Sequence, residues 1–207
     1  MARVGAVNGV TPAAPRMTRG VRPESAPIGF LQRIYRATRA LNDRFLYPRR
    51  HLAVRRRLSN APRPRRILVV CDGNLCRSPY LEAVLQRSLP DIAVTSAGFV
   101  GSDRAVPQIS VALSAQRGLE LSHYRSRPIT QSKVQDVDLV IVMDAGQARR
   151  MARNFRVKRG RVVIAGDLEP SFNESRAIRD PWNQSVEAYK STFDRLDRCA
   201  ATLVRLL

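Results

Sequence analysis

The feature that most constrains this chain is a loop that joins a buried strand to a helix. Residues 67–70 read Ile-Leu-Val-Val, a short continuous apolar run typical of a strand covered on both faces. The loop that follows reads Cys71-Asp72-Gly73-Asn74-Leu75-Cys76-Arg77-Ser78-Pro79, and a helical pattern begins at its end. Ligands of α/β sheets bind at the carboxyl ends of strands, so this loop is where we expect a binding site.

The residue types in the loop point to a phosphate. A helix N-terminus offers unpaired N–H groups and the positive end of the helix dipole. Gly73 and Asn74 tolerate left-handed backbone conformations, which let successive N–H groups turn inward as an anion nest. The same field favours the nucleophilic thiolate form of Cys71. The planar fork of Arg77 can hold two phosphate oxygens, and Ser78 can donate a hydrogen bond to the thiolate.

The cysteine count bears on metal binding and on cell compartment. Cys71 and Cys76 could be read as a metal pair or as inert buried thiols, but C-x4-C is a poor zinc spacing and no second pair follows. We therefore expect no metal and no cofactor. Cys199 lies in a helical pattern and is expected in the core. An odd cysteine count, no secretory signal pattern and no run of about 20 apolar residues predict a cytoplasmic protein without a transmembrane segment.

The charge divides the chain into segments. The formal net charge is +19, yet most of the excess lies before Ile67, where sixteen arginines face only Glu24 and Asp43. Residues 1–27 are rich in proline and show no periodicity, which predicts a disordered segment. Residues 28–65 are expected to form a basic amphipathic arm and a linker, and residues 66–207 the folded domain.

The arm carries a helical pattern. We expect the helix to end at Pro48 and a stiff linker to follow around Pro62 and Pro64. The apolar residues recur at helical spacing, with arginines between them: Phe30, Ile34, Leu41 and Phe45.

Strands and helices alternate in the domain. Further strands are expected at 92–95, 138–143 and 162–164. Helices are expected at 79–85, 111–117, 147–154 and 185–207. This alternation predicts an α/β fold, a four-stranded parallel sheet flanked by helices, with the phosphate-binding loop after the first strand.

In sequence, the strand, the C-x-G-N-x-C-R-S-P loop and the helix resemble the low-molecular-weight protein tyrosine phosphatases of bacterial type. The resemblance runs from Ile67 to about Leu207. It includes Ser96-Ala97-Gly98, His123-Tyr124-Arg125-Ser126, Met143-Asp144 and Asp180-Pro181-Trp182. It implies that Cys71 attacks phosphorus to form phosphocysteine, that Arg77 binds the phosphoryl oxygens and that Asn74 holds the loop in shape. It also implies that Asp180 serves as general acid and then as general base.

The chain departs from the family pattern at several positions. Asp72 stands where relatives usually carry a neutral residue; pointing inward it would repel a phosphate dianion, and pointing to solvent it would do little. The tryptophan of the eukaryotic relatives is absent, so Phe99 or Trp182 is expected to supply the apolar wall for the substrate ring. Leu75 favours phosphotyrosine, because a threonine here accompanies phosphoarginine activity in bacterial relatives. Cys76 either forms a protective disulfide with Cys71 or is a small buried residue.

These observations predict a protein-tyrosine phosphatase acting on phosphotyrosine proteins, with a bacterial tyrosine kinase as one candidate substrate. A phosphoarginine phosphatase on the same scaffold is the alternative. An arsenate reductase is disfavoured, because only Cys199 lies beyond Cys76. A third alternative is a degenerate domain whose basic arm binds an acidic surface or partner. The residues expected to bind phosphate beside the catalytic Cys71 and Arg77 are Asp72, Gly73, Asn74, Leu75, Cys76 and Ser78.

Overall fold

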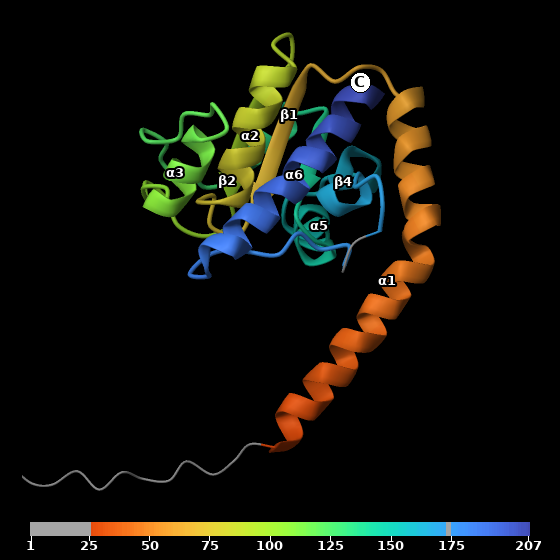
Figure 1. Ribbon diagram of the computed structural model, residues 1–207. Coiled ribbons are helices and arrows are strands. Elements are labelled where there is room, and N and C mark those ends of the chain that lie inside the picture. Colours follow the sequence, from red (N-terminus) through yellow and green to blue (C-terminus); the bar gives the residue numbers. More distant parts are fainter. Residues whose placement is uncertain (1–25, 173–174) are drawn as a thin grey trace, which may run out of the picture.

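A four-stranded parallel sheet forms the centre of the protein (Figure 1). The structure, a computed structural model, describes residues 26–172 and 175–207; between residues 26 and 40 it describes the backbone and, of the side chains, that of Thr38. The strand order is β2-β1-β3-β4, and every neighbouring pair is parallel. The strands are β1 (Arg66–Cys71), β2 (Ala93–Gly98), β3 (Leu139–Val142) and β4 (Val162–Ile164). The predicted α/β fold is confirmed.

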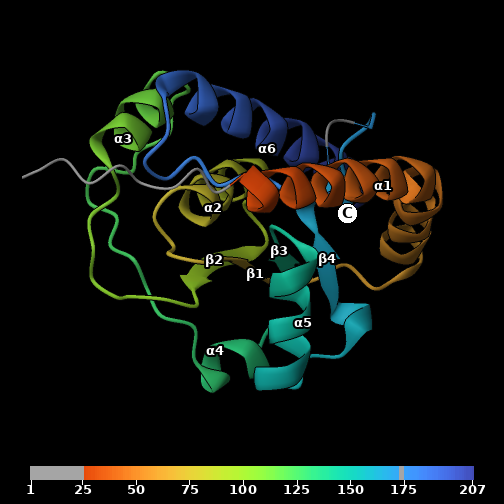
Figure 2. The same cartoon turned by 90° about the horizontal axis from the view of Figure 1, so that it is seen from below.

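Helices cover both faces of this sheet (Figure 2). Helices α2, α3 and α6 and part of α1 lie on one face, whereas α4 and α5 lie on the other. Among the described residues the α-helices are α1 (Ala26–Asn60), α2 (Arg77–Ser88), α3 (Gln108–Ala115), α4 (Gln131–Gln135), α5 (Ala145–Asn154) and α6 (Val186–Leu206). Two short 3-10 turns, η1 (Arg159–Arg161) and η2 (Ala165–Asp167), flank β4.

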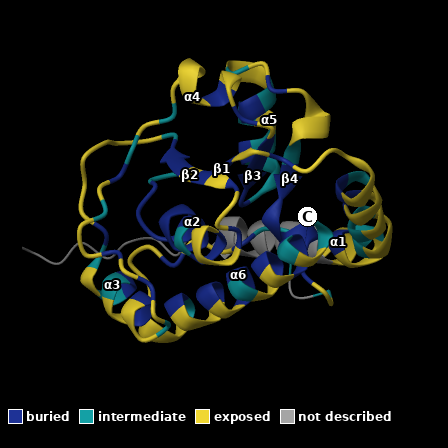
Figure 3. Ribbon diagram, turned by 90° about the horizontal axis from the view of Figure 1, so that it is seen from above, coloured by how far each residue is buried: buried dark blue, intermediate teal, exposed yellow. Residues whose placement is uncertain are grey.

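Strand β1 shows why the run after residue 66 is apolar throughout. Ile67 and Val69 point into the core beneath α2 and α6, and Leu68 and Val70 point into the core beneath α5. All four side chains are fully buried. Helix α6, by contrast, alternates between buried and exposed residues along its length, as a surface helix does (Figure 3). Since the strands are parallel, their carboxyl ends share one edge of the sheet, and Cys71 lies at that edge.

Helix α1 is longer than the sequence predicted. It was expected to end at Pro48, but it continues through that residue to Asn60, and Figure 1 shows a bend part-way along it. A proline inside a helix costs one backbone hydrogen bond and a steric clash, about 3 kcal/mol, and usually kinks the helix. The C-terminal part of α1 offsets this cost because it packs on the domain and buries Val54 and Leu58. The disorder prediction falls almost wholly on residues 1–25, which lie outside the described residues.

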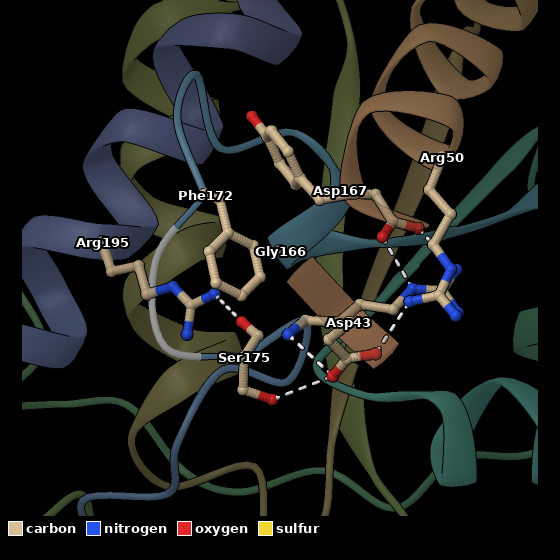
Figure 4. Close-up of a pocket in the computed structure, with 9 residues that line it drawn as sticks. Asp43, Arg50, Gly166, Asp167, Phe172, Ser175 and Arg195 are labelled. Atoms are coloured by element: carbon tan, nitrogen blue, oxygen red, sulfur yellow. Dashed lines mark hydrogen bonds and ion pairs between the residues drawn. The ribbon is translucent and has the colours of Figure 1, made fainter. Parts of the chain in front are cut away.

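Polar contacts fix α1 to the domain (Figure 4). The carboxylate of Asp43 accepts hydrogen bonds from Arg50 at 2.7 Å, from the Ser175 hydroxyl at 3.3 Å and from the Arg176 backbone N–H at 3.2 Å. The Tyr47 hydroxyl donates to the Glu169 carbonyl at 2.6 Å. The void between these residues measures about 10 Å³, room for one water at most, so the junction is packed. None of the described helices is both long and apolar enough to cross a membrane.

Helix α1 packs against the turn η2. The central residue of this turn, Gly166, leaves no room for a side chain. A Cβ on Gly166 would lie 2.1 Å from the carbonyl oxygen of Arg176. We expect Gly166→Ala to lower the free energy of unfolding by about 1–3 kcal/mol or more through overpacking, measured by urea denaturation.

Gly160→Ala is the matched control, because a Cβ on Gly160 would meet nothing within 4 Å. Its free energy of unfolding should stay within about 0.5 kcal/mol of the wild-type value. Equal losses in the two variants would contradict the predicted clash at η2.

Candidate active site

The loop between β1 and α2 holds an unusual backbone conformation. Asn74 adopts a φ of 51°, in the left-handed region. Cys76, the N-cap of α2, makes no side-chain capping hydrogen bond. The first N–H groups of α2 are therefore not satisfied by a capping side chain, which leaves them as candidate donors for an anion.

Gly98, at the end of β2, lets this loop pack against the sheet. A Cβ on Gly98 would lie 2.8 Å from the Asn74 backbone nitrogen and 2.8 Å from the Asp72 carbonyl oxygen. The Val100 N–H donates to that same carbonyl oxygen at 2.9 Å. The glycine of the Ser96-Ala97-Gly98 motif is thus needed for a close approach of two backbone segments.

The Asn74 side chain uses its full hydrogen-bonding capacity. Its amide nitrogen donates to Ser78 Oγ and to Ser96 Oγ, both at 2.8 Å. Its carbonyl oxygen accepts from the Arg127 backbone N–H at 2.7 Å and from the Tyr124 hydroxyl at 3.0 Å. These four bonds explain why the loop contains an asparagine, since an aspartate would lack the two donors.

Two donors converge on the sulfur of Cys71, which is only 2% exposed. The Asn74 backbone N–H donates to Cys71 Sγ at 3.2 Å, and Ser78 Oγ lies 3.0 Å from the same sulfur. Because Ser78 accepts the Asn74 amide proton, its own proton is free to point at the sulfur. Both contacts place polar groups directly at the Cys71 sulfur.

A buried carboxylate supports this network from α2. Glu82 is 5% exposed, pairs with the Arg127 guanidinium at 2.5 Å and accepts a hydrogen bond from Ser96 at 2.6 Å. Neither Glu82 nor Arg127 was predicted from the sequence as a site residue. The available signal was a glutamate in the apolar pattern of a helix that directly follows the loop.

Arg77 lies between two carboxylates. Its guanidinium is buried, donates to the Ile178 carbonyl at 3.1 Å, and contacts both Asp180 and, at 3.4 Å, Asp72. The structure therefore brings Asp180 next to Cys71 and Arg77, although more than a hundred residues separate Asp180 from Arg77 in sequence. Trp182 lies two residues after Asp180, and its backbone N–H donates to the Asp180 carboxylate at 3.2 Å.

Asp72 fits neither of the two orientations considered from the sequence. Its carboxylate is partly exposed, pairs with Arg150 of α5 and accepts a hydrogen bond from Gln147 at 2.9 Å. Burial acts to raise the pKa of Asp72, but the hydrogen bond and charge of Arg150, with Arg77 and Gln147, outweigh burial and lower the pKa. The carboxylate is thus ionised and largely neutralised by Arg150, a residue that the sequence analysis did not identify.

A cavity of about 240 Å³ opens above the loop. Its apolar wall consists of Leu75, Val100 and Trp182, of which Trp182 is 50% exposed. Phe99 does not line the cavity; its ring lies under the Arg150 guanidinium, 3.9 Å from the centroid. The lining residues are Cys71, Asp72, Gly73, Leu75, Cys76, Val100, Arg104, Asp180 and Trp182. Of the two predicted ring contacts, the structure places only Trp182 at the cavity.

Cys76 is a buried free thiol whose Sγ lies 3.6 Å from the Tyr189 hydroxyl. Burial raises the pKa of Cys76 to about 12, so this thiol is protonated at neutral pH. Its pairing with Cys71 under oxidation stays a prediction. Within residues 26–172 and 175–207, no group of three or more His, Cys, Asp or Glu residues could hold a metal ion.

Comparison with known proteins assigns this arrangement to a family. Residues 66–207 match the model of the low molecular weight phosphotyrosine protein phosphatases, and the chain belongs to that family. A curated relative, the probable low molecular weight protein-tyrosine-phosphatase EpsP of Ralstonia nicotianae, is 35% identical over 64% of this chain and 88% of its own.

Solved structures agree. The tyrosine phosphatase AmsI of Erwinia amylovora superposes with a TM-score of 0.66 at 27% identity, covering 72% of this chain and 96% of that one. The YwlE arginine phosphatase of Geobacillus stearothermophilus superposes with a TM-score of 0.62 at 26% identity, covering 69% and 92%. The fold and the loop are therefore shared with cysteine-dependent phosphatases.

The pairing of Asp72 with Arg150 generates a prediction. In Arg150→Met the Asp72 carboxylate loses its main partner and competes with phosphate for Arg77. We expect the inhibition constant of inorganic phosphate to rise about tenfold, equivalent to about 1.4 kcal/mol. The measurement is competitive inhibition of aryl phosphate hydrolysis.

Adding Asp72→Asn to Arg150→Met should restore the inhibition constant, because the competing charge is then removed. Arg149→Met is the control, since Arg149 is the exposed neighbour on the same helix. An inhibition constant that stays high in the double variant would show that Arg150 acts on the anion directly.

Proposed function

We propose that this chain hydrolyses phosphotyrosine in proteins through a phosphocysteine intermediate formed on Cys71. The observation that carries the proposal is the meeting of three groups at one edge of the sheet. Cys71 Sγ lies near the N-terminal end of α2, Arg77 is the first residue of that helix, and the Asp180 carboxylate contacts Arg77. The proposed nucleophile and proton donor therefore line one cavity, and the proposed phosphate ligand contacts the proton donor.

The first step forms a sulfur–phosphorus bond. The Cys71 thiolate attacks phosphorus, the bond from phosphorus to the tyrosine oxygen breaks, and Asp180 gives its proton to the departing oxygen. The loop N–H groups and Arg77 bind the phosphoryl oxygens, on which negative charge is held in the transition state.

The second step releases phosphate. Asp180, now ionised, accepts a proton from a water molecule that attacks phosphorus. The bond between phosphorus and sulfur breaks, and the electron pair returns to Cys71 as thiolate. Ser78 stabilises this leaving group, because its hydroxyl lies 3.0 Å from the sulfur.

The shape of the cavity favours an aryl phosphate. Leu75, Val100 and Trp182 form an apolar wall around an opening whose floor is the loop, which suits a phenyl ring. The alternative substrate is phosphoarginine, supported by the likeness to YwlE arginine phosphatase. A guanidinium substrate gains less from an apolar wall, so Leu75 supports phosphotyrosine.

The physiological setting follows from the same chemistry. We propose a cytoplasmic location, supported by the three buried cysteines, all of which are free. A bacterial tyrosine kinase is the proposed protein substrate, on the basis of family resemblance.

The roles of Cys71 and Asp180 are tested on a series of aryl phosphates whose leaving groups differ in pKa. Cys71→Ser should reduce turnover to background. Asp180→Asn should lose about 10²–10⁴-fold on the poorest leaving groups and much less on nitrophenol, because only a poor leaving group needs a proton.

Asp136→Asn is the control for Asp180→Asn, since the Asp136 side chain is 72% exposed and forms an exposed ion pair with Arg66. A loss in Asp180→Asn that is uniform across the leaving groups would argue against general acid catalysis by Asp180.

Substrate choice is tested with matched peptides that carry phosphotyrosine or phosphoarginine. The value of kcat/KM should be at least about tenfold higher for phosphotyrosine, because an apolar ring contact contributes roughly 1–3 kcal/mol. Leu75→Thr should shrink this ratio. Equal kcat/KM values for the two peptides in the wild type would contradict phosphotyrosine as the preferred substrate. They would leave the phosphocysteine chemistry intact.

A further inference from the structure

Helix α1 has two faces with different chemistry. One face packs on the domain through Asp43, Tyr47, Val54 and Leu58, which lie on one side of the helix by their spacing. A second set, offset by two residues, comprises Leu41, Phe45 and Leu52. Two residues correspond to roughly 200° around a helix, so this second set lies on the side turned away from the domain.

The second set is unusually exposed. Phe45 is 79% exposed, Leu41 57% and Leu52 47%, and they account for three of the six large exposed apolar side chains among the described residues. Two of the others, Val100 and Trp182, line or flank the active-site cavity. We call Leu41, Phe45 and Leu52 the apolar stripe of α1. No contact between α1 and the domain among the described residues covers it.

Arginines flank this stripe. The term outer face of α1 is used for a set of exposed residues: Leu41, Arg44, Phe45, Arg49, Leu52, Arg55 and Arg56. Arg44 and Arg55 lie on one side of the stripe by helical position, and Arg49 and Arg56 lie on the other. Within residues 26–172 and 175–207, none of these four arginines forms an ion pair.

The charge decides which partner fits. The sequence of α1 contains nine arginines and a single acidic residue, Asp43, which already pairs with Arg50. A second copy of the same helix would therefore meet like charge along the whole stripe. An anionic surface that also accepts apolar side chains matches both the arginines and the apolar stripe.

We propose that the outer face of α1 docks on an anionic lipid surface, with the helix lying parallel to the membrane. Phe45, Leu41 and Leu52 enter the boundary between headgroups and acyl chains, and the flanking arginines extend to the lipid phosphates. The helix lies on the membrane and does not span it, in agreement with its many charges. Basic side chains next to an anionic leaflet add to the apolar contribution.

The position of α1 links this surface to the active site. In Figure 1 the N-terminal part of α1 projects beyond the edge of the sheet at which β1 ends in Cys71. A lipid surface bound by α1 therefore lies at the same end of the molecule as the active-site loop. This part of the inference rests on the proposed function, whereas lipid binding itself does not.

The test is co-sedimentation of the full chain with vesicles of phosphatidylcholine alone or mixed with phosphatidylglycerol. We expect binding only to the mixed vesicles, weakened by added salt. Leu41→Ser combined with Phe45→Ser should weaken binding by about tenfold or more, because two apolar side chains no longer enter the lipid. Arg44→Gln combined with Arg49→Gln should weaken it as well.

Val186→Ser is the matched control, an exposed apolar residue at the start of α6 that should leave vesicle binding unchanged. All variants should retain wild-type turnover of a small aryl phosphate, which excludes misfolding and keeps this test separate from that of the proposed function. Absence of binding to mixed vesicles overturns the proposal. So does binding that survives the Leu41 and Phe45 substitutions, or a dimer in solution that Phe45→Ser dissolves.

Discussion

The active site depends on the four hydrogen bonds of the Asn74 side chain. They hold a residue in the left-handed region, and in that conformation the Asn74 backbone N–H donates to Cys71 Sγ. The same side chain donates to Ser78, whose hydroxyl oxygen lies 3.0 Å from the Cys71 sulfur. Ser96, Tyr124 and Arg127 bring β2 and the segment after α3 into this network. The motifs that are far apart in the sequence thus serve one purpose, which is to keep a strained loop in place.

Charge around Arg77 is the second constraint on the site. Arg77 contacts two carboxylates, those of Asp72 and Asp180, and the phosphate of a substrate must compete with both. Arg150 relieves the competition on one side because it pairs with Asp72 and stacks on Phe99. Asp72, which was considered from the sequence as a charge that could repel phosphate, is thereby paired with a positive charge. Asp180 is the second carboxylate on Arg77 and is the residue proposed as general acid.

The parts that could be predicted from sequence are those with local signals. The run at 67–70 marked β1, the residue types of the loop marked the phosphate site, and the last strand was predicted at the residues it occupies. Arg150, Glu82 and Arg127 were not found, because each acts through a partner far away in sequence and no local pattern marks such a pair. Helix α4 is too short to show a period. Phe99 was expected at the cavity on residue type alone, and the direction of a side chain after a strand cannot be read from its type.

The failure at Pro48 has a different physical origin, because there a local rule was overruled by tertiary contacts. Proline ends an isolated helix, but on both sides of Pro48 the chain is bound to the domain, by Asp43 and Tyr47 before it and by Val54 and Leu58 after it. Burial of the last two side chains contributes roughly 3–6 kcal/mol, enough to offset the proline. The consequence is that α1 is held on the domain from Asp43 to Leu58. A rigid helix presents Leu41, Phe45 and Leu52 at a fixed angle to the active site, so whatever binds that face also orients the catalytic edge of the sheet.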